Sequence, residues 1–220
     1  MVIGMIVSGR LKSKFAEFSR EPLSSGLSGK QVAEKMLRDN GIYDVQVTAV
    51  EGRLTDHYNP ATKVVNLSED VYSGQNIAAA AVAAHECGHA VQHATAYRWL
   101  EMRSKLVPLV QVSSTLMNFV LMAAAFFAFA TAMYNQMLLL VIILQGAITV
   151  FTLITLPVEI DASRRGLAWI ESSGIAGGEE HDQAKTALSW AALTYIVAAL
   201  ASLATLFYFI MRYLGSRRVD

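Results

Sequence analysis

The sequence predicts an α+β membrane protein, in which a small α/β domain is joined to a helical transmembrane bundle of at least three spans. Three observations predict this fold class. Hydrophobic residues make up 54% of the 220 residues and charged residues only 16%, below the quarter that is typical of a soluble domain. Mean hydropathy is +0.37. Alternating and helical patterns typical of a folded domain are confined to residues 20–105, whereas long uncharged stretches follow.

The overall charge excludes one class of partner. Eighteen basic and 18 acidic residues give a formal net charge of zero, whereas a nucleic-acid-binding protein needs a basic surface to displace counterions from phosphates. We therefore expect no nucleic-acid partner.

The chain has a single cysteine, Cys87, and this excludes an internal disulfide.

Residues 1–19 form a short N-terminal segment whose first part is apolar. Met1 to Ser8 is too short to span a bilayer, and the basic residues Arg10, Lys12 and Lys14 follow at once. The segment is therefore interpreted as a truncated transmembrane helix or as an interfacial segment. A cleavable signal peptide is disfavoured, because its basic residues precede its apolar stretch.

Residues 20–105 are predicted to form an α/β domain with a three-stranded sheet. Ser28 caps a helix with apolar residues at helical spacing, and Gly41 ends it. Alternation then predicts strands near 45–49, 54–57 and 63–67, the last two antiparallel around a turn at 58–62. From Gln75 or Asn76 onward, dense alanine predicts a helix.

Two uncharged stretches predict the transmembrane helices. No Asp, Glu, Lys or Arg occurs between Lys105 and Glu159, and residues 106–158 are long enough to cross a bilayer twice, at about 20 residues per helix. We expect spans near 108–133 and 137–157, separated by the polar triplet at 134–136. A second uncharged run, Thr186 to Met211, predicts a third span, which we assign together with its basic tail to a last segment at 190–220. Three basic residues follow the run, namely Arg212, Arg217 and Arg218.

The predicted alanine-rich helix carries the motif HExxH, as His85-Glu86-Cys87-Gly88-His89. Two histidines four residues apart lie on one helical face, so both imidazoles can bind one Zn²⁺, while Glu86 can act as general base for a water molecule. Two ordinary surface histidines are the alternative. It is disfavoured because the alanine-rich flanks predict a buried helix, where His and Glu are costly without a role.

A catalytic zinc site needs a third protein ligand, and two candidates are present. His93 lies about 80° around the helix from His85, which makes tetrahedral ligation from one straight helix difficult. A contact with a ligand or substrate, or helix packing, suits it better. Glu159 opens the 159–189 segment, and two membrane crossings return it to the face of the histidine helix. Glu159 is the better candidate, with an interfacial ion pair as its alternative.

Three blocks of sequence resemble the bacterial neutral zinc metallopeptidases of the YugP-like group. They are Gly52 to Pro60 (Gly-Arg-Leu-Thr-Asp-His-Tyr-Asn-Pro), Ala83 to His93 around the HExxH motif, and Leu156 to Arg165 around Glu159. The resemblance covers nearly the whole chain. It implies a multi-pass protein of the bacterial inner membrane and of the gluzincin type.

The resemblance also implies roles for individual residues. His85 and His89 would bind zinc, Glu159 would be the third ligand and Glu86 the general base. More distantly similar membrane peptidases carry Asp four residues after the ligand Glu, whereas this chain has Ser163 there and an acid at Asp161.

Four further residues are weaker candidates for supporting the site or for binding substrate, namely Asp161, His93, His57 and Tyr58. An extended peptide could pair with the sheet edge that precedes the zinc helix, which would bring His57 and Tyr58 near the site. Either could stabilise the oxyanion of a tetrahedral intermediate. A turn-stabilising role for this pair is equally compatible with the pattern.

The functional hypothesis is a membrane-bound zinc metalloendopeptidase acting on membrane or membrane-proximal proteins, with the lipid bilayer and a protein or peptide substrate as partners. More Lys and Arg residues lie near the spans on the predicted zinc side than opposite, so the positive-inside rule places the site in the cytoplasm. One alternative is a non-catalytic quality-control or assembly protein with a structural or vestigial zinc site. Another is a hydrolase of non-peptide bonds.

Overall fold

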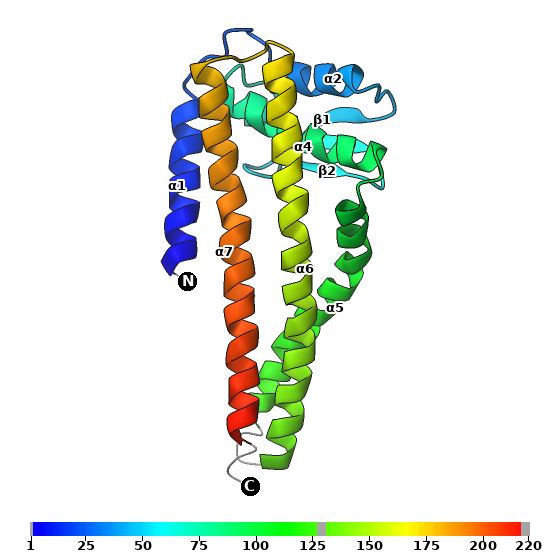
Figure 1. The fold of residues 1–220 in the computed structure, drawn as a ribbon, viewed down its shortest axis with the longest axis vertical. Coiled ribbons are helices and arrows are strands. Elements are labelled where there is room, and N and C mark those ends of the chain that lie inside the picture. The colour runs from blue at the N-terminus through cyan, green and yellow to red at the C-terminus, as the bar shows by residue number, and fades with distance from the viewer. Residues whose placement is uncertain (1, 127–130, 217–220) are drawn as a thin grey trace. The chain divides into compact units, whose positions relative to one another are not determined.

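The computed structural model describes residues 2–126 and 131–216, which form a mostly helical chain with one small sheet (Figure 1). Its elements group into two compact units, Met1–Leu100 with Pro157–Thr194, and Glu101–Leu156 with Tyr195–Asp220. The first unit therefore combines two stretches that are far apart in sequence. Two long helices, α6 (Thr131–Ser172) and α7 (Glu179–Ser216), each contribute to both units.

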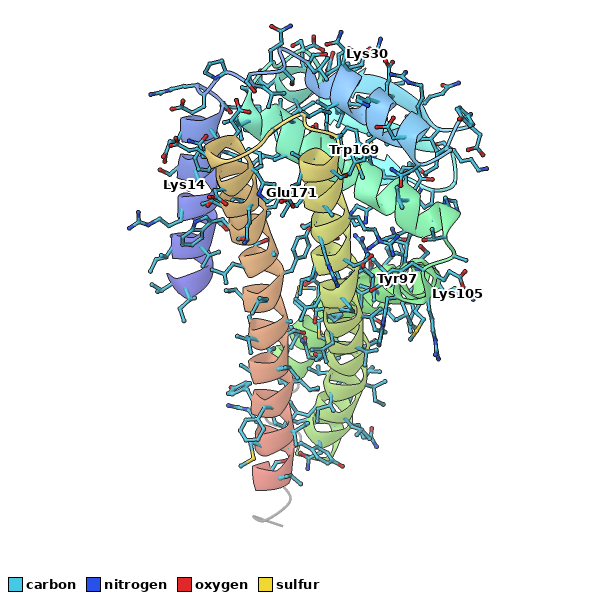
Figure 2. All side chains as sticks on the ribbon, turned by 45° about the horizontal axis from the view of Figure 1, so that its top comes forward. Lys14, Lys30, Tyr97, Lys105, Trp169 and Glu171 are labelled. Atoms are coloured by element: carbon cyan, nitrogen blue, oxygen red, sulfur yellow. The ribbon has the colours of Figure 1, made fainter. Side chains whose placement is uncertain are left out.

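The first unit begins with two helices. Helix α1 spans Val2–Phe18 and helix α2 spans Gly29–Asp39. Ser28 and Gln31 form a capping box at the start of α2, which satisfies two backbone donors that a helix start leaves free. Trp169 of α6, labelled in Figure 2, donates its Nε1–H to Asp39. The predicted helix after Ser28 is thus confirmed.

The three-stranded sheet consists of β1 (Gln46–Val50), β2 (His57–Asn59) and β3 (Val64–Ser68), in the order β1-β3-β2. Strand β3 is parallel to β1 and antiparallel to β2. The antiparallel pair was predicted, but the proposed strand at 54–57 is wrong, since pairing begins only at His57. The Asn59 side chain accepts hydrogen bonds from the amides of Ala61 and Thr62, so the turn starts after Asn59 and not at Tyr58.

Two helices complete this part of the first unit. Helix α3 spans Glu69–Tyr72, and α4 spans Ile77–Ala94. Asn76 caps α4 by accepting from the amide of Ala79, and most residues of α4 are buried. Side chains from α2, α4, β3 and the ends of α6 and α7 form one hydrophobic core. Helix α4 is therefore held on several sides.

The second unit contains α5 (Arg98–Phe126) and the remaining parts of α6 and α7. Among the described residues, three helical stretches are long and apolar enough to cross a membrane: Arg98–Ala123, Met133–Ser172 and Glu179–Ser216. Helices α5, α6 and α7 share a small cluster of buried and partly buried apolar side chains. A polar cluster lies in the same unit, where Gln145 and Thr149 of α6 form hydrogen bonds with Ser202 of α7.

The boundary predicted between the first two spans is wrong, because residues 134–136 lie inside α6. Two of these residues, Tyr134 and Asn135, form hydrogen bonds with side chains of α7. Arg212 donates to the Tyr134 hydroxyl at 2.8 Å, and Ser216 donates to Asn135 at 2.6 Å. Such pairing removes the need for a turn at this point. Residues 127–130 of the predicted first span, and Arg217 and Arg218 after the third, lie outside the described residues.

Candidate metal centre

The candidate metal centre is built where α4 and α6 approach each other closely within the first unit. A Cβ atom added to Gly88 of α4 would lie 2.4 Å from the carbonyl oxygen of Ala162 in α6. A Cβ atom added to Gly166 of α6 would lie 2.9 Å from the carbonyl group of Ala84. Both distances are below ordinary van der Waals contact, so the two helix backbones can meet only because glycine occupies these positions.

This approach brings Glu159 of α6 to the two motif histidines. The Glu159 Oε2 atom is 3.3 Å from His85 Nε2 and 3.6 Å from His89 Nε2. Two donor atoms that each lie about 2.0–2.1 Å from a tetrahedral zinc ion are about 3.3–3.4 Å apart. Among the described residues, this is the one group of three or more potential metal ligands whose donor atoms all lie within 4.8 Å of one another. The residues therefore fit zinc.

The His89 ring is oriented by Gln92, which is completely buried. The Gln92 amide nitrogen donates to the carbonyl oxygen of Val158 and to the carboxylate of Asp161, at 2.8 and 2.9 Å. Its oxygen therefore faces His89 Nδ1 at 3.0 Å, and because an amide oxygen only accepts, Nδ1 must carry the proton. The lone pair of a neutral His89 then lies on Nε2, the atom that faces Glu159.

Asp161 thus supports the site through Gln92 and does not contact a metal ligand directly. Its carboxylate also accepts from the guanidinium of Arg165, one turn further along α6. The position four residues after Glu159 has its own role, because the Ser163 hydroxyl lies 3.0 Å from His85 Nδ1. A hydroxyl can accept from Nδ1–H, which would leave His85 Nε2 free to bind a metal ion.

Glu86 lies on α4 beside the histidines and is held by the sheet. The backbone amide of Tyr58 in β2 donates to Glu86 Oε2 at 3.0 Å. Glu86 as a residue is 8% exposed, so one of its carboxylate oxygens is fixed by the strand within a buried site. Strand β2 is an edge strand of the sheet, and its outer edge therefore faces the candidate general base.

The remaining sequence candidates separate into two groups. The backbone amide of Tyr58 contacts Glu86, whereas its hydroxyl lies 2.8 Å from His93 Nδ1, two turns further along α4. His93 is not part of the ligand group. Successive residues of a strand face opposite sides, and His57 is bound instead to Thr55 and Asn66. Of the two oxyanion candidates, only Tyr58 faces α4.

Cys87 has a packing role. Its thiol is fully buried and contacts the Ala33 carbonyl oxygen at 3.5 Å. Burial raises the pKa of this thiol well above its usual range, and the nearby Glu86 charge raises it further. A neutral thiol is a poor nucleophile and a poor metal ligand.

The role of Gln92 and the contact between Ser163 and His85 were not predicted from the sequence. Signals for both were present. Gln92 lies three residues after His89 on α4, and Ser163 lies four residues after Glu159 on α6, which is the spacing at which helical side chains share a face.

Comparisons with known proteins agree with this geometry. Residues 1–214 match the family model described as "Putative neutral zinc metallopeptidase". The chain belongs to this family. It is also 43% identical over 211 residues to the protein named "Putative membrane protease YugP" of Bacillus subtilis (strain 168), covering 94% of this chain and 90% of that protein. No solved structure matches the chain. Membership of a neutral zinc metallopeptidase family is consistent with the donor set of His85, His89 and Glu159.

Proposed function

We propose that this chain is a membrane-bound zinc metalloendopeptidase of the gluzincin type. The observation that carries the proposal is the convergence of His85, His89 and Glu159 at zinc-ligand separations, with Glu86 held beside them. The family membership and the name of the relative support a protease in general terms. Peptide-bond hydrolysis and the role of each residue are the proposed part.

The proposed ligands are His85 Nε2, His89 Nε2 and a carboxylate oxygen of Glu159. Zinc bound there would polarise the scissile carbonyl and lower the pKa of a water molecule to about 7. The protein determines the rest. Gln92 and Ser163 hold the imidazole rings so that Nε2 faces the ligand position, and the α4–α6 contact brings Glu159 into reach.

Glu86 is the proposed general base. Because the Tyr58 amide fixes Oε2, Oε1 is the oxygen placed to accept a proton from the attacking water. Glu86 then transfers this proton to the leaving amine nitrogen, which completes cleavage of the peptide bond.

Tyr58 is the proposed donor to the oxyanion. Burial raises the pKa of its phenol, and the nearby Asp44 carboxylate raises it further, so the hydroxyl stays protonated at neutral pH. If His93 Nδ1–H donates to the phenol oxygen, the Tyr58 proton is free to be donated to substrate. An extended peptide can pair with the outer edge of β2, which runs past Glu86.

The proposed substrates are membrane or membrane-proximal proteins, because the ligand Glu159 belongs to a helix long and apolar enough to cross a membrane. We place the protein in the bacterial inner membrane, with the metal centre on the cytoplasmic side. More basic residues lie near the spans on that side than on the other. Those counted on the proposed zinc side are Arg10, Lys12, Lys14, Arg98, Arg103, Lys105, Arg164 and Arg165, against Arg212, Arg217 and Arg218 opposite.

The test compares Glu86→Gln with wild type in zinc content and in cleavage. Detergent-purified full chains are reconstituted with single-span reporter proteins that carry a fluorophore and a quencher. Glutamine can still accept from the Tyr58 amide but cannot take a proton, so we expect unchanged zinc and at least a hundredfold slower cleavage. Glu34→Gln, on the exposed face of α2, is the matched control. Equal cleavage by wild type and Glu86→Gln would refute the role of Glu86 as general base, and no cleavage by either would favour the non-catalytic alternative.

A further inference from the structure

The first unit contains a cavity that is not lined by any candidate metal ligand. Its volume is about 430 Å³, within the range of small-molecule pockets, about 300–1,000 Å³. Helix α1, the segment 51–56 and the start of α4 form its walls. The apolar part of the lining comes from six residues, Phe15, Ala16, Leu54, Val71, Ala78 and Ala79.

The segment 51–56 presents an exposed apolar side chain and an exposed cation to this cavity. Asp56 anchors the segment by accepting from the amide and hydroxyl of Ser68, at 2.7 and 3.0 Å. Leu54 has a φ of 59° and is 56% exposed. A leucine held in the left-handed region is uncommon, and such backbone strain gathers at ligand sites. The hydrogen bonds to Ser68 explain the position of Asp56. They do not explain why Leu54 adopts a left-handed conformation or why Arg53 is exposed.

Two cations, Lys12 and Arg53, and two carboxylates, Asp56 and Asp70, line the cavity. Lys12 contacts no carboxylate within the described part of the chain, whereas Lys14 on the same helix pairs with Glu17. The Arg53 side chain is 85% exposed and lies 3.4 Å from Asp70, which is also exposed. Both oxygens of Asp56 face Ser68. An ion pair between two such exposed side chains contributes little energy, so Arg53 can leave Asp70 and face a ligand together with Lys12.

Helix α1 indicates what the ligand is. Its first turns carry exposed apolar side chains, namely Val2, Ile3, Met5 and Ile6, which are 58–71% exposed. Basic residues follow at Arg10, Lys12 and Lys14. Apolar turns followed by basic residues are typical of a helix that leaves a bilayer through the headgroup layer. Lys12 would then lie at the depth of the lipid phosphates.

We propose that this cavity is a phospholipid-binding site. The phosphate group lies between Lys12 and Arg53, and part of an acyl chain enters the apolar interior beside Phe15, Leu54 and Ala79. The site is independent of the proposed peptidase activity. It binds the peptidase unit to the membrane surface through a single lipid.

The test measures the binding of fluorescently labelled phosphatidylglycerol to the delipidated full chain in detergent. Lys12→Ala and Arg53→Ala should each weaken binding about fivefold. Ala16→Trp, at an exposed lining position, should fill the cavity and abolish binding. Lys14→Ala removes the same charge from the same helix, outside the cavity, and should leave binding unchanged. All four positions are at least partly exposed, and thermal unfolding verifies that each variant is folded.

Competition identifies the ligand chemistry. Unlabelled phosphatidylglycerol should displace the probe, and diacylglycerol, which lacks the phosphate, should displace it far less. Inorganic phosphate that competes as effectively as the lipid would overturn the lipid assignment in favour of a free anion. Displacement by an apolar peptide at lower concentration than by lipid would assign the cavity to peptide. The proposal would also be overturned if Lys12→Ala and Arg53→Ala both bound the labelled lipid with the same affinity as the wild-type chain.

Discussion

Replacing Gly88 by alanine should weaken zinc binding without touching a ligand. The new Cβ atom would lie 2.4 Å from the Ala162 carbonyl oxygen, whereas ordinary contact begins at about 3.4 Å, so α6 must move away by about 1 Å. Glu159 lies about one turn before Ala162 on α6 and moves with it. Metal–ligand distances tolerate only about ±0.2 Å. We expect zinc affinity to fall about 10- to 100-fold, the range found when groups that support metal ligands are lost.

Stability should change far less than zinc affinity. Overpacking of a helix contact costs about 1–3 kcal/mol, while alanine is favoured over glycine in a helix by about 1 kcal/mol. The net destabilisation is therefore about 0–2 kcal/mol, and the variant should stay folded. Competition with a chromophoric zinc chelator on the detergent-purified full chain measures affinity, and thermal unfolding of the metal-free protein measures stability.

Two further glycines provide a graded comparison. Gly166→Ala would place its Cβ atom 2.9 Å from Ala84, which requires a movement of about 0.5 Å and predicts an intermediate loss. Gly146→Ala, on α6, would meet no atom within 4 Å and should bind zinc normally. The reasoning fails if Gly88→Ala binds zinc as tightly as Gly146→Ala, or if the order of the two clashing variants is reversed.

Other contacts give further predictions. Ser163→Ala should weaken zinc binding about tenfold, whereas Ser172→Ala, on the same helix, should not; equal affinities in a chelator titration would contradict the role assigned to the Ser163 hydroxyl. Gln92→Leu should lower zinc affinity about 10- to 100-fold because it frees the His89 ring, and unchanged zinc content after dialysis would refute this. Cys87 should react with iodoacetamide only after unfolding, because burial raises the pKa of its thiol; rapid labelling of the folded chain, followed by mass spectrometry, would show otherwise.

Local patterns predicted most of the secondary structure of the first unit. The capped helix after Ser28, the alanine-rich helix after Asn76 and an antiparallel strand pair all form. The strand at 54–57 was misplaced because Leu54 and Thr55 have β propensity, whereas tertiary contacts hold this segment in a bend beside α1. The parallel pairing of β1 with β3 joins residues that are not neighbours along the chain, and periodicity carries no information about such pairing.

Long-range contacts also explain why residues 134–136 belong to a helix and not to the predicted turn. Tyr134 and Asn135 are polar residues in an apolar region, a pattern typical of a turn. In the structure their side chains bind Arg212 and Ser216 of α7, which are about 80 residues away in sequence. No local rule identifies these partners.

For the candidate site, the amino-acid sequence was enough to predict the groups that lie within one helical turn of each other. Four-residue spacing places His85 and His89 on one face of α4 with Glu86 beside them, because helix geometry fixes neighbours at that distance. The order of the spans already favoured Glu159 over His93, but only the folded chain shows its carboxylate beside both histidines. The other contacts between separate elements were not predictable from local patterns. They turn Tyr58 and not His57 toward α4, and they make Ser163 the partner of the His85 ring. The physical reason is that these contacts depend on how closely two backbones approach, and that distance is set by packing at Gly88 and Gly166 and not by the local conformation of either helix.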